Sequence, residues 1–138
     1  MNSFEIHGGT CLSGTITPQG AKNEALQIIC AVLLTSEKIT IKNIPDIRDI
    51  RVLIDLIKKF GVEVNQTSRN DFEFKSEKVN LNFMQSDEFY ALRTKIRGSI
   101  MIMGPLLARF QKAYIPRPGG DKIGRRRLDT HFIGFEKL

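Results

Sequence analysis

The sequence has few residues that could bind a metal ion or form a disulfide bond. It contains two cysteines, Cys11 and Cys30, and two histidines, His7 and His131, and these four are not at the spacing of a zinc-binding motif. A metal site is therefore not expected, and no disulfide is needed. Cys30 lies within the apolar run ALQIICAVLL, which indicates a small buried hydrophobic residue rather than a reactive thiol.

Long hydrophobic runs are also absent from the sequence. Its apolar stretches are much shorter than the roughly 20 residues that cross a bilayer, and its start, MNSFEIHGG, lacks the basic and apolar regions of a signal peptide. We therefore expect a cytoplasmic protein. Of the 138 residues, 41% are hydrophobic and 26% are charged, which excludes a disordered chain and suffices for one compact domain.

Acidic residues are outnumbered by basic ones. The sequence has 21 Lys and Arg against 15 Asp and Glu, a net charge of +6 that favours an anionic partner without specifying a metabolite or a nucleic acid. The excess is concentrated in PRPGGDKIGRRRLD, residues 116–129. Its two adjacent glycines allow close backbone approach, its arginines can grip a phosphate, and a helix beginning near Arg126 would add free N–H groups. The stretch predicts a phosphate site, with an exposed basic run as the alternative.

The first half of the chain contains a clear succession of secondary-structure patterns. Short apolar segments predict two strands before Gln19. The patterns that follow predict a helix over 23–34, a strand over 38–44, a helix over 47–60 and a hairpin of 62–66 with 71–75. In the second helix Ile50, Leu53, Ile57 and Phe60 share one face, and Gly61 is the expected C-terminal cap.

The second half of the chain repeats the first. Leu33-Leu34 recurs as Leu106-Leu107, 73 residues later, and KITI at residue 38 recurs as KAYI, 74 residues later; the helix end IKKF returns as FEKL after 78 residues. About four extra residues therefore fall within the basic loop, where functional sites are common. The second copy stops inside its last helix, so we expect the N-terminal part of a longer protein, with an unfinished unit that favours self-association.

Charged residues near the predicted helix starts are candidate site residues. Asp121 lies among cations that favour its ionised form. Asp129, three residues into the last predicted helix, can accept a hydrogen bond from a ligand or complement the helix dipole. Lys22 and Asn23 stand at the start of the first helix, and Arg97 lies near the start of the corresponding helix in the second copy. Both predicted helices thus begin beside a cation, which favours an anion there.

Three motifs, GAKNEAL, RGSIMIMGPLLARF and PGGDKIGRRRLDTHFIGFEKL, resemble the N-terminal part of the UDP-N-acetylglucosamine 1-carboxyvinyltransferases, enzymes of peptidoglycan synthesis. The resemblance implies an α/β fold, an inside-out α/β barrel built of βαβαββ repeats. Residues 1–21 would form strands packed with a second domain, and residues 22–138 would form the first repeat and part of the second of the sugar-nucleotide-binding domain. The implied reaction transfers the enolpyruvyl group of phosphoenolpyruvate to the 3′-hydroxyl of UDP-N-acetylglucosamine, without a metal or an organic cofactor.

The resemblance also assigns roles to the candidate residues. Asp121 would be the general acid. Lys22 would contact phosphoenolpyruvate, Asn23 the sugar nucleotide, and Arg97 and Arg126 the anionic groups of the substrates. The uridine end would be held by the segment Arg126, Arg127, Leu128, Asp129 and Thr130, with Asp129 on the nucleotide. Asp121 stands where most of the family carry a cysteine, so we predict poor inhibition by the epoxide fosfomycin, which alkylates a thiolate. Met101 stands where the family often has tryptophan. Because the base for the sugar hydroxyl comes from the second domain, this chain alone is not expected to turn over.

A nucleic-acid-binding module is the alternative interpretation, because similar repeats and basic loops occur in RNA-binding proteins. Against it, no aromatic residues are interleaved with the arginines; Tyr114 and Phe132 only flank the loop. Single-strand binding usually needs aromatic stacking platforms. We therefore expect neither a nucleic-acid partner nor a membrane partner.

Overall fold

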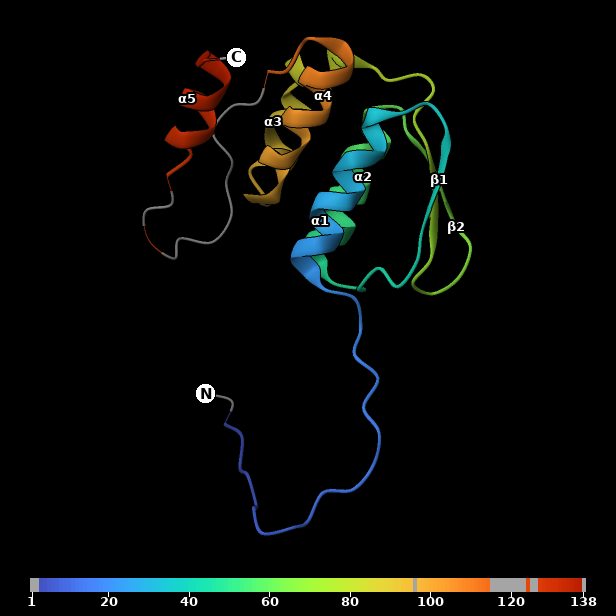
Figure 1. Cartoon of the computed structure of the whole chain (residues 1–138), viewed down its shortest axis with the longest axis vertical. Helices are drawn as coiled ribbons and strands as arrows, with labels where there is room; N and C mark the ends of the chain where they lie inside the picture. Colours follow the sequence, from blue (N-terminus) through green and yellow to red (C-terminus); the bar gives the residue numbers. More distant parts are fainter. Residues whose placement is uncertain (1–2, 96, 115–123, 125–126, 138) are drawn as a thin grey trace.

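The computed structural model describes residues 3–95, 97–114, 124 and 127–137. Residues 3–21 form an extended segment that leads away from a body of helices and one small sheet (Figure 1). The elements, with η for 3₁₀-helix, are α1 (Lys22–Ala31), η1 (Val32–Leu34), β1 (Lys38–Ile41), α2 (Arg48–Lys59), β2 (Glu63–Gln66), β3 (Phe72–Lys75), η2 (Leu81–Gln85), α3 (Asp87–Arg93), η3 (Arg97–Ile102), α4 (Met103–Phe110) and α5 (Asp129–Lys137).

The sheet has three antiparallel strands in the order β1-β3-β2. Phe74 of β3 pairs with Ile39 of β1 on one side and with Val64 of β2 on the other, and it is only 1% exposed. The predicted hairpin is confirmed. The predicted strand over 38–44 is shorter than expected, because Asn43 has a left-handed backbone with φ of 58°, which ends the extended run after Ile41.

The helices of the first unit form as their patterns predict. The predicted buried face of α2, residues Ile50, Leu53, Ile57 and Phe60, is at most 1% exposed. Gly61 follows the helix with φ of 90°, a conformation that favours glycine, and its N–H donates to the carbonyl of Lys58 at 2.9 Å. The first unit therefore has the predicted order of helix, strand, helix, strand, strand.

The core of the first unit extends into helices that the sequence patterns did not predict. Phe60, the residue directly after α2, packs edge to face against Phe83 of η2 and Phe89 of α3, with ring centroids 5.2 and 5.6 Å apart. Phe83 and Phe89 also contact each other at 5.6 Å. Such aromatic triads bury a large apolar area. They fix η2 and α3 against α2.

Arg109 of α4 joins the second unit to the first. Its Nη1 donates to the backbone carbonyls of Leu33, Thr35 and Ser76 at 3.0, 3.0 and 2.9 Å. Ser76 is itself 1% exposed, and its hydroxyl donates to the carbonyl of Val32 at 2.7 Å. One guanidinium therefore satisfies several buried acceptors that would otherwise be costly to desolvate.

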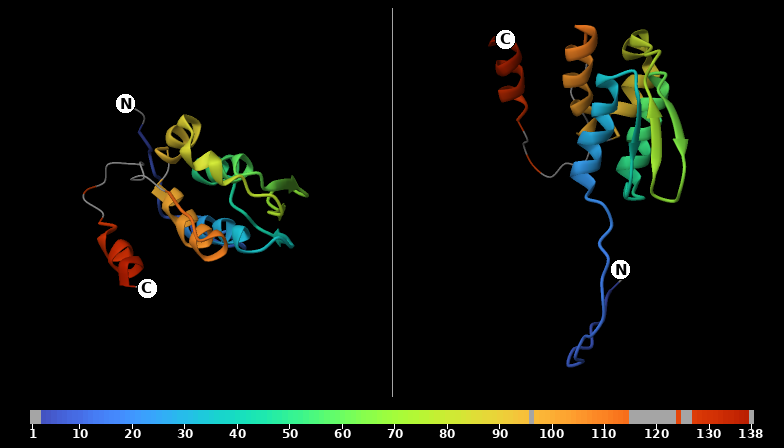
Figure 2. Two further views of the ribbon diagram at one scale, coloured as in Figure 1. Left: turned by 90° about the horizontal axis from the view of Figure 1, so that it is seen from above. Right: turned by 45° about the vertical axis from the view of Figure 1, so that its right-hand side comes forward.

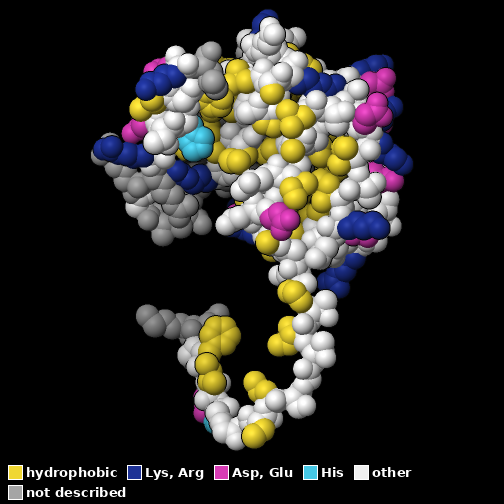
Figure 3. Space-filling model, viewed as in Figure 1, with side chains coloured by type: hydrophobic (Ala, Val, Ile, Leu, Met, Phe, Trp, Pro, Cys, Tyr) yellow, Lys and Arg dark blue, Asp and Glu magenta, His cyan; other side chains and the backbone are white. Residues whose placement is uncertain are grey.

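The two strands predicted before Gln19 are not formed, since the described residues 3–21 contain no strand. A strand requires a partner for its backbone groups, and this segment is not paired to the sheet. Four of its apolar side chains, Phe4, Ile6, Leu12 and Ile16, are 89–96% exposed. Yellow hydrophobic groups are seen along the segment in Figure 3.

The second unit follows the predicted repeat only in part. Leu106 of α4 is fully buried like Leu33, its counterpart in the first unit. Residues 112–114 of KAYI are not in a strand, and no described residue after them forms a strand with which they could pair. α5 forms but buries none of its described residues, and both views in Figure 2 place α4 between α5 and α1. In the part of the chain that is described, none of the helices has the length and apolar character needed to cross a membrane.

Candidate functional site

α1 begins at Lys22, one residue before the predicted range of 23–34, and its first turn presents backbone N–H groups without a side-chain cap. Ala21, just before the helix, has an extended backbone with φ of −75° and ψ of 129°, and it makes no capping hydrogen bond through its side chain. Its carbonyl accepts from the N–H of Ala25 at 3.0 Å. The first N–H groups of α1 therefore face outward beside Lys22 and Asn23, an arrangement that favours an anion.

The position of this helix start is set by close packing at Gly20. A Cβ atom at residue 20 would overlap the carbonyl oxygen of Asn43 and would lie 3.2 Å from Cδ of Pro45. Asn43 is itself held, because its N–H donates to Oδ1 of Asp71 at 2.9 Å. The glycine of GAKNEAL thus allows α1 to begin directly against the turn between β1 and α2.

Lys22 forms an ion pair with Asp49, a residue that the sequence analysis did not select. Nζ of Lys22 donates to Oδ2 of Asp49 at 2.8 Å, and the two side chains are 50% and 39% exposed. Asp49 lies in the first turn of α2, where a carboxylate complements the positive end of the helix dipole. The starts of α1 and α2 are therefore linked through the cation that the resemblance assigns to phosphoenolpyruvate.

Arg97 is brought to the same helix from the second unit. It is the first residue of η3 and is half-buried. η3 packs closely on α1, since a methyl group added at Gly98 would lie 3.1 Å from Cδ1 of Leu26. Leu26 is one helical turn after Lys22 and Asn23, so Arg97 precedes a residue that contacts α1 one turn from its start.

The other predicted residues lie at the start of α5 or outside the described residues. Asp121 and Arg126 lie outside the described residues. α5 begins at Asp129, so the prediction of a start near Arg126, with Asp129 three residues into the helix, is wrong. The first turn is formed from the carbonyl of Leu128, which accepts from the N–H of His131 at 3.0 Å. A start at this carbonyl makes Asp129 the first helical residue.

The residues around the start of α5 are largely exposed. Nε of Arg127 lies 3.7 Å from Oδ2 of Asp129, and the two side chains are 66% and 61% exposed. Leu128 is half-buried and Thr130 is exposed. α4 stands between α5 and α1, so these four residues form a group separate from Lys22 and Asn23 (Figures 1 and 2).

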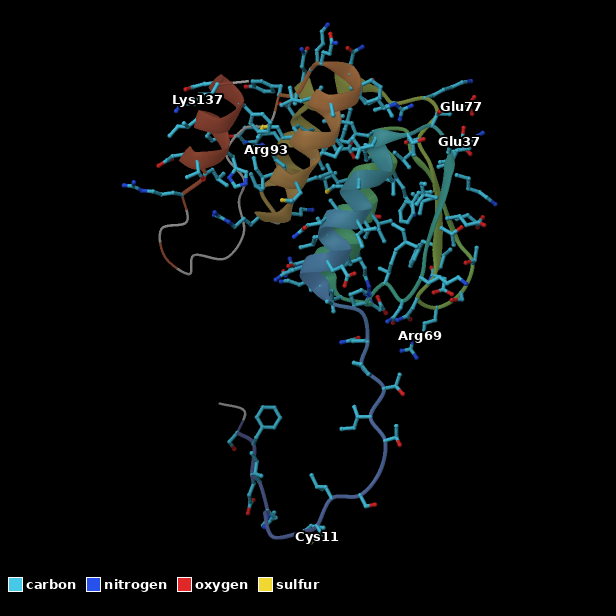
Figure 4. The ribbon with its side chains drawn as sticks, viewed as in Figure 1. Cys11, Glu37, Arg69, Glu77, Arg93 and Lys137 are labelled. Carbon is cyan, nitrogen blue, oxygen red and sulfur yellow. The ribbon has the colours of Figure 1, made fainter. Side chains whose placement is uncertain are left out.

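A hollow of about 440 Å³ lies between α2 and the β2–β3 hairpin. Arg69 marks its place at the hairpin turn, at the opposite end of the sheet from Glu37 and Glu77 (Figure 4). In its wall, Arg51 donates to Oδ1 of Asp46 at 2.6 Å, and this hydrogen bond lowers the pKa of Asp46. None of the predicted site residues lines the hollow.

The family model described as EPSP synthase (3-phosphoshikimate 1-carboxyvinyltransferase) matches residues 6–138, nearly the whole chain. The chain belongs to the EPSP synthase family. Among the described residues of this family member, no group of three His, Cys, Asp or Glu side chains lies close enough to hold a metal ion.

Several curated relatives in the EPSP synthase family share one name. Over 138 residues the chain is 56% identical to UDP-N-acetylglucosamine 1-carboxyvinyltransferase of Bacteroides thetaiotaomicron, and 50% and 45% identical to the proteins of that name from Porphyromonas gingivalis and Treponema denticola. Each match covers all of this chain and 32% of the relative, so the chain spans about a third of the length of these relatives. None of the three carries a nucleic-acid-binding name, and that alternative gains no support.

Asp49, the ion-pair partner of Lys22, was not selected by the sequence analysis of this EPSP synthase-family chain. It is 27 residues from Lys22, so no local pattern connects the two. The only available signal was an acidic residue in the first turn of a predicted helix, which is common for electrostatic reasons alone. Its pairing with Lys22 depends on the parallel packing of α1 and α2, whose starts lie at the same end of the body in Figure 1.

Proposed function

We propose that this chain is part of an enolpyruvyl transferase that uses UDP-N-acetylglucosamine as acceptor and phosphoenolpyruvate as donor, in peptidoglycan synthesis. The observation that carries the proposal is the 56% identity over all 138 residues to a relative named for this reaction. We extend it to the fold: the three-stranded sheet and its helices would be the first unit of an inside-out α/β barrel of three repeats. The catalytic base for the sugar hydroxyl would come from a second domain.

Lys22 and Arg97 supply the positive charge for phosphoenolpyruvate, an anion with both a phosphate and a carboxylate. The ammonium of Lys22 is half-exposed at the start of α1, so it can donate to a ligand while it remains bonded to Asp49. The uncapped N–H groups of α1 add donors at the same place. Charge-assisted bonds of this kind are worth roughly 1.5–3 kcal/mol each.

Asp121 is the proposed general acid. In the addition step, its carboxyl proton would pass to the methylene carbon of phosphoenolpyruvate while the 3′-hydroxyl of the sugar bonds to the adjacent carbon and loses its own proton to a base. Elimination of phosphate with loss of a proton from the methyl group then regenerates the double bond. A positioned acid typically contributes about 10²–10⁴-fold. A carboxylate is a poor nucleophile toward an epoxide, so we expect no covalent fosfomycin adduct at residue 121 by mass spectrometry, and an adduct in Asp121→Cys.

The group at the start of α5 would bind the uridine end of the sugar nucleotide. Asp129 is at the first helical position and 61% exposed, so its carboxylate is available to the N–H or hydroxyl donors of a nucleotide. Arg127, 3.7 Å away, can grip a diphosphate oxygen. One sugar nucleotide bound at this group would have to extend from the start of α5 to Lys22 and Arg97.

Binding of the acceptor by the 138-residue chain tests the proposal. We expect saturable amide NMR shifts at Asn23 and at residues 127–130 with UDP-N-acetylglucosamine, and weaker, unsaturated shifts with 3-phosphoshikimate or a short RNA. Asp129→Asn should weaken nucleotide binding roughly ten-fold, the value of one hydrogen bond to a charged group. Phosphate release from both substrates should be at background for the chain alone.

The matched control is Glu136→Gln, which removes the same charge from the other end of α5. It should leave nucleotide affinity unchanged, because Glu136 is more than a helical turn from Asp129. Stronger binding of 3-phosphoshikimate than of the sugar nucleotide would assign the chain to a different acceptor. Saturable RNA binding with a steep salt dependence would overturn the proposal altogether.

A further inference from the structure

We propose that Asp49 is a positioning residue: through its ion pair it orients the ammonium of Lys22 toward the anion bound at the start of α1. The inference rests on the proposed function, since it names a second residue of the same site. Asp49 is assigned no contact with substrate. Its effect is exerted only through Lys22.

The carboxylate of Asp49 is well placed to act as a fixed anchor. Asp49 is the second residue of α2, and the next residue, Ile50, is 1% exposed in the core. The N–H of Arg51 donates to the carbonyl of Ile47 at 3.1 Å, so the backbone on both sides of Asp49 is held. A side chain with two rotatable bonds on such a backbone has little freedom, whereas Lys22 has four rotatable bonds.

The geometry leaves Lys22 able to bind a ligand while it is anchored. An ammonium has three N–H donors, and Asp49 takes one of them at 2.8 Å. With the Nζ atom fixed at that distance, the other two donors are available to an anion. Lys22 is 50% exposed, so an anion can reach them from solvent.

Two effects of Asp49 on an anionic ligand oppose each other. Its negative charge repels the anion, but both partners are substantially exposed, and water screens such interactions strongly. Its anchoring removes rotamer freedom from Lys22 before the ligand arrives, and ordering such a side chain at binding costs a factor of roughly two to ten in affinity. We infer that anchoring prevails, so loss of Asp49 weakens binding although it makes the chain more positive.

The test compares three single variants of the 138-residue chain, Asp49→Asn, Asp49→Glu and Lys22→Gln, with the double variant that combines Asp49→Asn and Lys22→Gln. The matched control is Asp46→Asn, which removes an equal charge and an ion pair from the approach to α2 without touching Lys22. Two quantities are measured: the NMR signal of Lys22 Nζ without ligand, and the affinity for phosphoenolpyruvate.

Asp49→Asn should broaden or shift the Nζ signal and weaken phosphoenolpyruvate binding about three- to ten-fold. Asp46→Asn should leave the signal unchanged and leave affinity equal or slightly higher, because it adds net positive charge. Asp49→Glu, which keeps a carboxylate, should restore part of the affinity. In the Lys22→Gln background, Asp49→Asn should have no further effect, as expected if Asp49 acts only through Lys22.

An unchanged Nζ signal in Asp49→Asn, or equal affinity losses with and without Lys22, would overturn the inference. A parent chain that does not bind phosphoenolpyruvate would also overturn it. UDP-N-acetylglucosamine, titrated in parallel, separates the two proposals. Nucleotide binding with no effect of Asp49→Asn refutes the positioning role alone, whereas loss of response to both substrates refutes the proposed function.

Discussion

Replacing Gly20 with alanine should destabilise the chain and displace the start of α1. The added Cβ would overlap the carbonyl oxygen of Asn43 and approach its carbonyl carbon to 3.1 Å. That carbonyl cannot move easily, because the N–H of Asn43 is bonded to Asp71 and the next N–H, of Ile44, donates to the carbonyl of Asn70 at 2.7 Å. Residues 20–22 must therefore shift. Forced overpacking of this kind typically costs about 1–3 kcal/mol.

Urea unfolding followed by circular dichroism measures the cost. With an m-value of about 1–3 kcal/mol/M, the midpoint for Gly20→Ala should fall by roughly 1 M. The control is Gly104→Ala in α4, where an added Cβ has no atom within 4 Å; it should stabilise by up to about 1 kcal/mol, because alanine favours a helix more than glycine does. Equal midpoints for the two variants, or Gly20→Ala with unchanged amide signals in the first turn of α1, would refute the reasoning.

Three further predictions concern other parts of the chain. Arg109→Met should lower the free energy of unfolding by roughly 1–3 kcal/mol, since it leaves buried carbonyls without their donor; an unfolding midpoint equal to that of the parent would contradict this. Hydrogen bonds from Lys38 and Asn65 lower the pKa of Glu73 below its ordinary 4.5. The ionised carboxylate of Glu73 therefore stabilises the folded chain at pH values above 4.5, and this stabilisation is lost as the pH falls through the lowered pKa. In Glu73→Gln, the urea midpoint of unfolding should fall less steeply with decreasing pH than in the parent chain. A midpoint that depends on pH as in the parent would contradict this role of Glu73. Burial raises the pKa of the Cys30 thiol to about 12, whereas Cys11 is exposed on the N-terminal segment (Figure 4). Iodoacetamide at mildly alkaline pH should therefore alkylate Cys11 and spare Cys30 until urea is added, as peptide mass spectrometry will show.

Elements whose stabilising contacts are local were predicted well. The buried face of α2 follows from the spacing of Ile50, Leu53 and Ile57, and the hairpin follows from two β-rich runs joined by a turn, because both patterns operate within a few residues. The strands expected before Gln19 did not form, since a strand depends on a partner that local sequence does not specify. η2 and α3 were missed because they are held by the distant ring of Phe60.

In the candidate site, too, local features could be predicted and long-range contacts could not. The start of α1 at Lys22 was predictable from GAKNEAL, and the importance of Arg97 was suggested by the internal repeat. The contact between Gly98 and Leu26, which brings Arg97 to α1, and the ion pair of Lys22 with Asp49 are long-range. The start of α5 was misplaced by three residues, because it depends on which carbonyl begins the first turn. Even when a structure is known, the assigned ends of a helix commonly differ by one or two residues between criteria.

The acceptors of Arg109 have a consequence for how freely this sequence can diverge. Three of them are main-chain carbonyls, at positions 33, 35 and 76. A carbonyl is present whatever side chain a residue carries, so at positions 33 and 35 this contact depends on the backbone, whereas Arg109 and the buried hydroxyl of Ser76, 3.2 Å from Nη1, contribute through their side chains. Substitutions at Thr35, which is half-buried, can therefore change the side chain without removing the carbonyl that Arg109 binds. The seating of α4 on the first unit can thus be kept while the side chain at position 35 changes.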